Sequence, residues 1–112
     1  MSVSNSIYLP KLATIKYIKE LTKDEKLFEI ELDNGEALAY MPGQFVEVSV
    51  FGIGEAPISI TSSFTRKNNS FELCVRAAGN VTNAMHKLKV GDKIGIRGPF
   101  GNGFDTEFLK KK

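Results

Sequence analysis

The residues with the clearest chemical potential lie between Ala77 and Thr82, where two alanines and a glycine lead into a predicted helix. A helix N-terminus offers free backbone N–H groups and a partial positive charge, so it suits a phosphate. Gly79 would allow close approach, Thr82 would add a hydroxyl donor, and Arg76 would add a cation. On this motif alone an ordinary capped helix is the more common case, because most helix starts bind only water.

A second unusual stretch is FGIGEAPISITSS, from Phe51 to Ser63. Two glycines and a proline interrupt a strand-like sequence, which we expect to resume over Ile58 to Ser62. Ser59 then lies between two isoleucines. Glycines in such a position often mark the close approach of a ligand or another backbone.

The remaining candidates for chemistry are single residues. His86 is the one histidine, and it lies off the apolar stripe of its helix, so we expect it to be exposed and assign it no catalytic role. Cys74 is the one cysteine, and a free cysteine is most often a small buried hydrophobe, although it could contact a ligand. One cysteine and one histidine are too few for a protein-held iron–sulfur cluster or a structural zinc site, so no metal is predicted.

Composition is that of a soluble globular domain. The chain has 112 residues, a formal net charge of +2, 42% hydrophobic and 25% charged residues. This charge is too small to indicate nucleic acid or an anionic membrane. No apolar run reaches the ~20 residues of a membrane-spanning helix, and the N-terminus does not resemble a signal peptide. We expect a cytoplasmic protein with a reduced cysteine.

Most of the chain alternates apolar and polar residues, which is typical of strands. Strands are expected over Lys11 to Leu21 and around Phe28 to Leu32, the second followed by a tight hairpin turn at Asp33-Asn34-Gly35. Further alternation places certain side chains on one face of their strands: Ala13, Ile15 and Tyr17; Val46, Val48 and Val50; Phe71, Leu73 and Val75; Ile94 and Ile96. The strand count and turn spacing predict an antiparallel sandwich or barrel.

One segment has a helical period. Val81, Ala84, Met85 and Leu88 stand at i, i+3, i+4 and i+7, which predicts a short amphipathic helix. Asn80 is the expected N-cap. Gly91-Asp92 is predicted as the turn before the next strand.

The order of these segments carries more information than any of them alone. MPGQFVEV, APISITSS, ELCVRAAGNVTNAM and LKVGDKIGIRGPFGNGF, in that order, resemble the flavin-binding domain of the ferredoxin–NADP reductase superfamily. The closest look is to sulfhydrogenase gamma subunits and to the electron-transfer subunits of anaerobic sulfite reductase and dihydroorotate dehydrogenase. The resemblance implies an all-β fold: a six-stranded antiparallel Greek-key barrel with one short helix.

The resemblance also implies FAD as cofactor. In the family, an Arg-x-Tyr-Ser segment runs along the isoalloxazine ring: the Arg meets the pyrophosphate, the Tyr stacks on the ring and the Ser reaches the N5 edge. Here the Arg position is Ala56 and the Tyr position is Ile58, whereas the Ser is kept as Ser59. An aliphatic contact would replace the aromatic stack, and we hypothesise that Arg76 supplies the missing charge.

The implied cofactor-binding residues come from three segments. The pyrophosphate loop of the family maps onto Gly79 to Thr82, the same residues that the helix start singles out, and a pyrophosphate site favours FAD over FMN. The full set is Pro57, Ile58, Ser59, Ile60, Cys74, Val75, Arg76, Gly79, Asn80, Val81 and Thr82. Pro57, Ile58, Cys74 and Val75 are expected to wall the ring.

The family pattern sets the expected domain plan. Residues 1–10 would be an N-terminal extension, 11–104 the FAD-binding barrel, and 105–112 a tail where an NAD(P)-binding domain would normally follow. NAD(P)H would then act only through a second domain, with partner subunits completing the enzyme. The predicted function is electron transfer in an NAD(P)H-linked flavoprotein oxidoreductase. The alternative is a flavin-free barrel that binds a protein partner.

Overall fold

A computed structural model describes residues 9–41, 43–61 and 69–101. These residues form six strands and one helix: β1 (Lys11–Glu20), β2 (Glu25–Leu32), β3 (Phe45–Val50), β4 (Gly54–Ser59), β5 (Phe71–Arg76), α1 (Asn80–His86) and β6 (Lys93–Phe100). All the strands belong to one antiparallel sheet with the order β4-β3-β6-β1-β2-β5.

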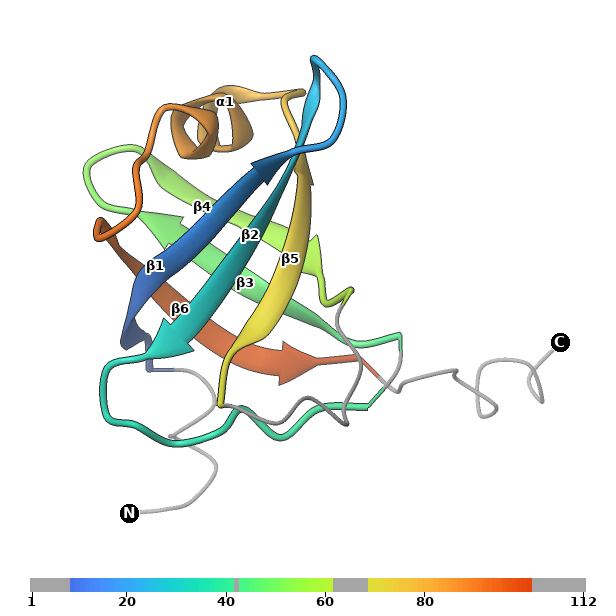
Figure 1. Cartoon of the computed structure of the whole chain (residues 1–112). Helices are drawn as coiled ribbons and strands as arrows, with labels where there is room; N and C mark the ends of the chain where they lie inside the picture. Colours follow the sequence, from blue (N-terminus) through green and yellow to red (C-terminus); the bar gives the residue numbers. More distant parts are fainter. Residues whose placement is uncertain (1–8, 42, 62–68, 102–112) are drawn as a thin grey trace, which may run out of the picture.

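The sheet curls on itself in the Greek-key pattern that the sequence predicts. β6 returns along a long connection to pair with β3, and the two edge strands, β4 and β5, meet at an isolated bridge between Ile60 and Leu73. The ladder is therefore continuous around the sheet except at this seam, where the described residues pair at one point and do not close a full barrel. α1 covers one end of the curled sheet (Figure 1).

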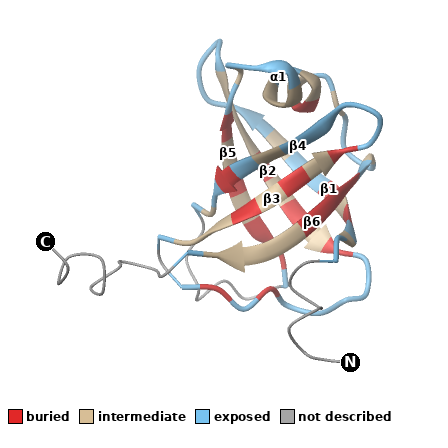
Figure 2. Cartoon of the chain, turned by 180° about the vertical axis from the view of Figure 1, so that it is seen from behind, coloured by how far each residue is buried: buried red, intermediate tan, exposed pale blue. Residues whose placement is uncertain are grey.

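The buried apolar residues of the strands form one core cluster, and Figure 2 shows buried segments on several strands of the sheet. Val46, Val48 and Val50 are buried, as are Phe71, Leu73 and Val75, so these predicted faces are confirmed. Met85 brings α1 into the same core with no exposed surface. The alternation of side chains thus defines which face of β3 and β5 remains available for a ligand.

The predicted inner face of β1 is wrong at Tyr17. Ala13 and Ile15 are fully buried, but Tyr17 is 52% exposed. The pairing of β1 with β2 shifts register between Ile15 and Tyr17, which is a β-bulge. The extra residue turns Tyr17 outward, and Ile18 packs against the core in its place.

Two turns differ from their predictions. Gly35 does adopt a positive φ of 82°, but β2 and the next strand, β3, are not neighbours, so Asp33-Asn34-Gly35 ends a strand without forming a hairpin. The strand predicted to resume at Ile58 begins at Gly54, because Phe51-Gly52-Ile53 is a tight connection between β3 and β4. Pro57 is tolerated within β4 because β4 is an edge strand. Ser62, the predicted strand end, lies outside the described residues.

An ion pair ties the edge strand β4 to β6. The Arg97 guanidinium donates two hydrogen bonds of 2.8 Å to the Glu55 carboxylate, which also accepts one from Ser49. The hydrogen bonds from Arg97 chiefly hold the pKa of Glu55 below its ordinary value of 4.5.

We expect the Glu55→Gln substitution to lower the free energy of unfolding modestly at neutral pH. Since the folded-state pKa of Glu55 is depressed, its contribution is fully present above the unfolded pKa and disappears as the pH falls through the folded value. Urea unfolding of wild type and variant should therefore show a gap that closes on acidification. Glu36→Gln is the control, because Glu36 is exposed and lies 3.9 Å from Lys11. A gap that persists unchanged in acid would contradict this role.

Candidate functional site

The seam between the edge strands forms the centre of the candidate site. β4 and β5 meet at the bridge between Ile60 and Leu73, and a second bond near it joins the Thr61 N–H to the Glu72 carbonyl at 2.9 Å. From this point the two strands diverge toward α1, which contacts both (Figure 1). Backbone groups on the facing edges of β4 and β5 are thus free of each other over most of their length in the described part of the chain.

The two edges present a common outer face. Pro57 and Ser59 are exposed on β4, while Cys74 is half-buried and Arg76 exposed on β5. Antiparallel register places Ser59 toward Cys74 and Pro57 toward Arg76 when it is continued from the bridge. Predicted site residues up to nineteen positions apart in the sequence therefore lie on the two strands that meet at the seam.

Two other predicted residues face the opposite way. Ile58 and Val75 are buried in the core, so their side chains support the sheet from inside. Their contribution to a ligand on the outer face would come from their backbone atoms. Ile60, at the bridge, is partly buried and packs against the same core.

The loop after β5 is held in shape by Thr82. Its hydroxyl accepts hydrogen bonds from the N–H groups of Ala78 and Gly79, each 2.9 Å long, and donates one to the Gly79 carbonyl at 3.2 Å. The N-cap is Gly79, so the prediction of Asn80 as N-cap is wrong: Asn80 is the first helical residue and is exposed. The Asn83 N–H donates to the Gly79 carbonyl at 2.8 Å, and the N–H groups of the turn before it have no acceptor within the helix itself.

The start of β4 packs closely against this loop. Gly54 has a φ of 152°, and a Cβ added there would lie 3.3 Å from Cγ2 of Val81. A larger residue would require the Val81 side chain to shift by a few tenths of an ångström and would also strain the backbone at this φ. Gly54 therefore allows the β3–β4 hairpin to pack closely against the helix start.

Arg76 and Cys74 are the charged and the nucleophilic side chain of the candidate site. The Arg76 side chain is 70% exposed and lies 3.7 Å from the Glu25 carboxylate, a loose pair that leaves the guanidinium able to turn toward a ligand. Burial, and then the charge of Glu25, raises the pKa of the Cys74 thiol. The Cys74 thiol is thus protonated and weakly nucleophilic at neutral pH.

His86 is not exposed as predicted. It is half-buried, its Nε2 donates a hydrogen bond to the Val75 carbonyl at 2.7 Å, and its ring lies 6.3 Å from that of Phe28. Lys26 in turn donates to the His86 carbonyl at 2.9 Å. These contacts join the end of α1 to β2 and β5, so His86 holds the helix against the site.

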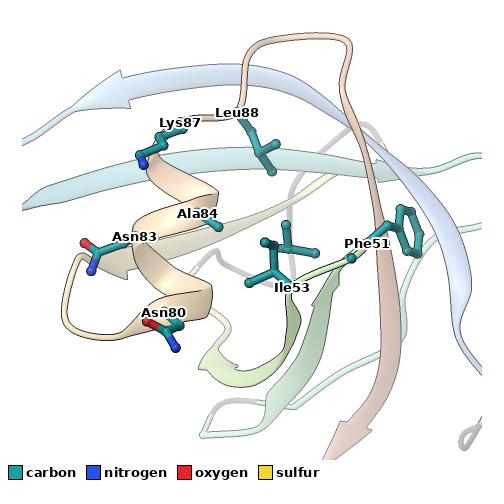
Figure 3. A pocket seen from close by; sticks show the side chains of 9 residues that line it. Phe51, Ile53, Asn80, Asn83, Ala84, Lys87 and Leu88 are labelled. Carbon is teal, nitrogen blue, oxygen red and sulfur yellow. The ribbon is translucent and has the colours of Figure 1, made fainter.

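A groove that the sequence did not predict lies on another side of α1. It has a volume of about 660 Å³ and runs between the helix and the β3–β4 hairpin (Figure 3). Its lining residues are Val50, Phe51, Gly52, Ile53, Asn80, Asn83, Ala84, Lys87 and Leu88. The last five of these residues follow helical spacing, so the sequence could have indicated that they share one side of the groove. The sequence did not predict the hairpin that forms the opposite side.

The outer face carries groups that suit a ligand with phosphates and a flat ring. Helix-start N–H groups and an exposed guanidinium are the donors that phosphates prefer, and Pro57, Ser59 and Cys74 offer a mixed apolar and hydroxyl surface to a ring. Within the described residues no cluster of three or more His, Cys, Asp or Glu could hold a metal ion. Nor does any described helix have the length and hydropathy to cross a membrane.

The fold and the site define a class of protein. A Greek-key sheet with a helix after the fifth strand matches the NADH-dependent reduced ferredoxin–NADP oxidoreductase, with a TM-score of 0.70 and 25% identity over 80% of this chain and 33% of that one. The architecture is that of a ferredoxin reductase-like flavin domain. The chain belongs to the oxidoreductase FAD-binding domain family, whose model matches residues 12–104.

Curated relatives agree with this assignment. Sulfhydrogenase 2 subunit gamma of Pyrococcus furiosus is 48% identical over 88% of this chain and 34% of its own length. A probable dihydroorotate dehydrogenase B (NAD(+)) electron transfer subunit of Methanocella arvoryzae is 38% identical over 86% of this chain and 34% of its own. The chain thus spans about a third of the length of these relatives. The predicted family, fold and FAD-binding function are confirmed, and the flavin-free alternative is disfavoured.

Proposed function

We propose that the chain holds FAD on the outer face of β4 and β5 and serves as the electron-transfer domain of an NAD(P)H-linked oxidoreductase. The observation that carries the proposal is the seam between β4 and β5, beside which α1 contacts both strands. Ser59 lies on the outer face of β4, and Cys74 and Arg76 lie on the outer face of β5. The names of the relatives, a sulfhydrogenase subunit and an NAD(+)-linked electron transfer subunit, support a role beside partner subunits.

Each group has a role in this proposal. Ser59 would donate its hydroxyl near the N5 edge of the ring, and Pro57 and Cys74 would line the ring, with Ile58, Ile60 and Val75 contributing backbone. Gly79, Asn80, Val81 and Thr82 would hold the pyrophosphate. When bound, the flavin supplies the redox chemistry, while the protein positions it and excludes competing reactions.

NAD(P)H and partner subunits belong to the larger assembly. We propose that the nicotinamide reaches the flavin through a second domain, because the chain spans about a third of a relative whose name includes NAD(+). A cytoplasmic location fits the free, half-buried Cys74.

The electron-transfer role can be tested on the flavin-loaded chain. Anaerobic reduction with dithionite followed by ferricyanide should bleach and then restore the flavin absorbance while the flavin stays bound through gel filtration. Release of the flavin on reduction would contradict a carrier role. Free FAD carried through the same column is the control.

Arg76→Ala should weaken FAD binding about fivefold. The guanidinium is well exposed, so its charge contact with the pyrophosphate is partly screened, and the loss should be near 1 kcal/mol. Titration by flavin fluorescence measures it, with Lys16→Ala, on β1 and away from the seam, as the control. An unchanged dissociation constant at low ionic strength would rule out this role for Arg76.

A further inference from the structure

The turn that ends β2 contains an asparagine followed by a glycine. Asp33 and Asn34 form the turn after Leu32, and Gly35 follows with a φ of 82°. Figure 1 shows this end of β2 at the side of the sheet away from α1. The turn does not form the hairpin that its sequence predicts, and it has no part in the candidate cofactor site.

The Asn34–Gly35 pair can react with itself. The backbone nitrogen of Gly35 can attack Cγ of Asn34 and close a cyclic imide, a succinimide, because glycine has no Cβ to obstruct the approach. Both residues are exposed, and a Cβ built on Gly35 would meet nothing within 4 Å. The ring therefore has room to form in the folded chain.

Glu36 holds both ends of the Asn34 side-chain amide. Oδ1 of Asn34 accepts a hydrogen bond from the Glu36 N–H at 2.9 Å, and Nδ2 of Asn34 donates one to Oε1 of Glu36 at 3.2 Å. The N–H group on Oδ1 stabilises the negative charge that develops on this oxygen when Cγ is attacked. The Glu36 carboxylate lies beside the nitrogen that must leave, so it can relay a proton to that nitrogen.

One hydrogen bond restrains the attacking nitrogen. The Gly35 N–H donates to the Leu32 carbonyl at 3.1 Å, and this bond must open before the attack. Because the turn is exposed, opening exchanges the bond for one to water at little net cost. Lys93, which donates to Asp33 at 2.7 Å, and Asn69, which donates to the Gly35 carbonyl at 2.7 Å, hold the two sides of the turn. The turn can thus open locally while β2 stays paired.

We propose that Asn34 is a modification site at which the folded chain converts its own side-chain amide to a carboxylate. The Gly35 nitrogen loses its proton and bonds to Cγ of Asn34. The bond from Cγ to Nδ2 breaks, and Nδ2 leaves as ammonia, which carries away the proton given up by Gly35. Water then opens the ring at one of its two carbonyls and leaves aspartate or isoaspartate at position 34. Nothing is oxidised or reduced, and the reaction is independent of FAD.

The test follows the 112-residue chain over time by peptide mapping with mass spectrometry, folded in mildly alkaline buffer and unfolded in urea. Because one hydrogen bond has to open, Asn34 in the folded chain should convert at most about tenfold more slowly than in the unfolded chain. Conversion should be faster at higher pH, since the Gly35 nitrogen must lose its proton. Asn83 should stay an amide in the folded chain, because it lies in α1 and precedes an alanine, whose Cβ obstructs ring closure. Mapping also separates Asn34 from Asn102, which precedes Gly103 outside the described residues.

A carboxylate substitution tests the role of Glu36. Glu36→Gln should slow the conversion of Asn34 severalfold in the folded chain and leave the rate in urea unchanged, because only the folded turn holds the carboxylate against Nδ2. Glu31→Gln is the matched control, since Glu31 is another carboxylate of this region but pairs with Lys16 at 3.9 Å. It should change neither rate. Asn34→Asp supplies the reference for the aspartate product in the peptide map.

Two results would overturn the proposal. One is an Asn34 that stays an amide in the folded chain while the unfolded chain converts it, because the turn would then protect the residue. The other is an Asn34 that converts in neither form. Equal rates for Glu36→Gln and wild type in the folded chain would overturn the role assigned to Glu36.

Discussion

Phe28→Ala should lower the free energy of unfolding by about 3–5 kcal/mol, among the largest effects expected for a single substitution in this domain. Phe28 is fully buried on β2, pairs with Leu73 on β5 and Ile18 on β1, and packs near the His86 ring. Its loss would leave a cavity under the strand that carries Cys74 and under the end of α1. Equilibrium urea unfolding followed by circular dichroism measures the change.

Leu12→Ala is the matched control for Phe28→Ala. Leu12 is 49% exposed on β1, so its truncation should change stability by roughly 0.5 kcal/mol or less. FAD added in excess should recover part of the stability that Phe28→Ala loses, because a ligand that binds the folded state stabilises it by mass action. If the two variants unfold at the same urea concentration, the assignment of the core is wrong.

Thr82→Val should weaken FAD binding by about tenfold while the chain stays folded. The substitution keeps the shape of the side chain but removes the hydroxyl that accepts from the Ala78 and Gly79 N–H groups. The loop then loses its fixed conformation, and a cap of this kind contributes roughly 0.5–2 kcal/mol. A loss in the upper part of this range, transmitted to the cofactor through the loop, corresponds to about a tenfold change in affinity.

Thr22→Val is the control for the loop. The Thr22 hydroxyl also accepts from a backbone N–H, that of Asp24 at 3.2 Å, but it lies in the turn between β1 and β2. It should affect stability slightly and FAD affinity not at all. Equal affinities for FAD in Thr82→Val and wild type would show that the loop does not hold the cofactor.

The sequence predicted the structure best where a local apolar pattern alone decides which side chains are buried in the core. Period-two alternation identified the inner faces of β3 and β5 because each strand has one buried face, and the i, i+4 stripe identified α1 through Val81 and Met85. The resemblance to the reductase family supplied the Greek-key topology. The outward direction of Cys74 followed from its place between the buried Leu73 and Val75.

What the sequence missed depends on contacts between distant segments. Tyr17 turns outward because a bulge shifts the pairing of β1 with β2, and no local signal marks that shift. His86 is drawn inward by the Val75 carbonyl on a neighbouring strand. The groove needs the β3–β4 hairpin beside α1, an arrangement in which Gly54 packs closely on Val81.

The central claim is that this domain binds FAD at the seam between β4 and β5, and a flavin titration tests it most directly. The purified chain would be incubated with excess FAD, desalted, and examined by visible absorption, with fluorescence titration for weaker binding. We predict saturable binding of one FAD per chain, weakened by Thr82→Val and not by Thr22→Val. Absence of saturable binding at the highest FAD concentration that remains soluble would contradict the account.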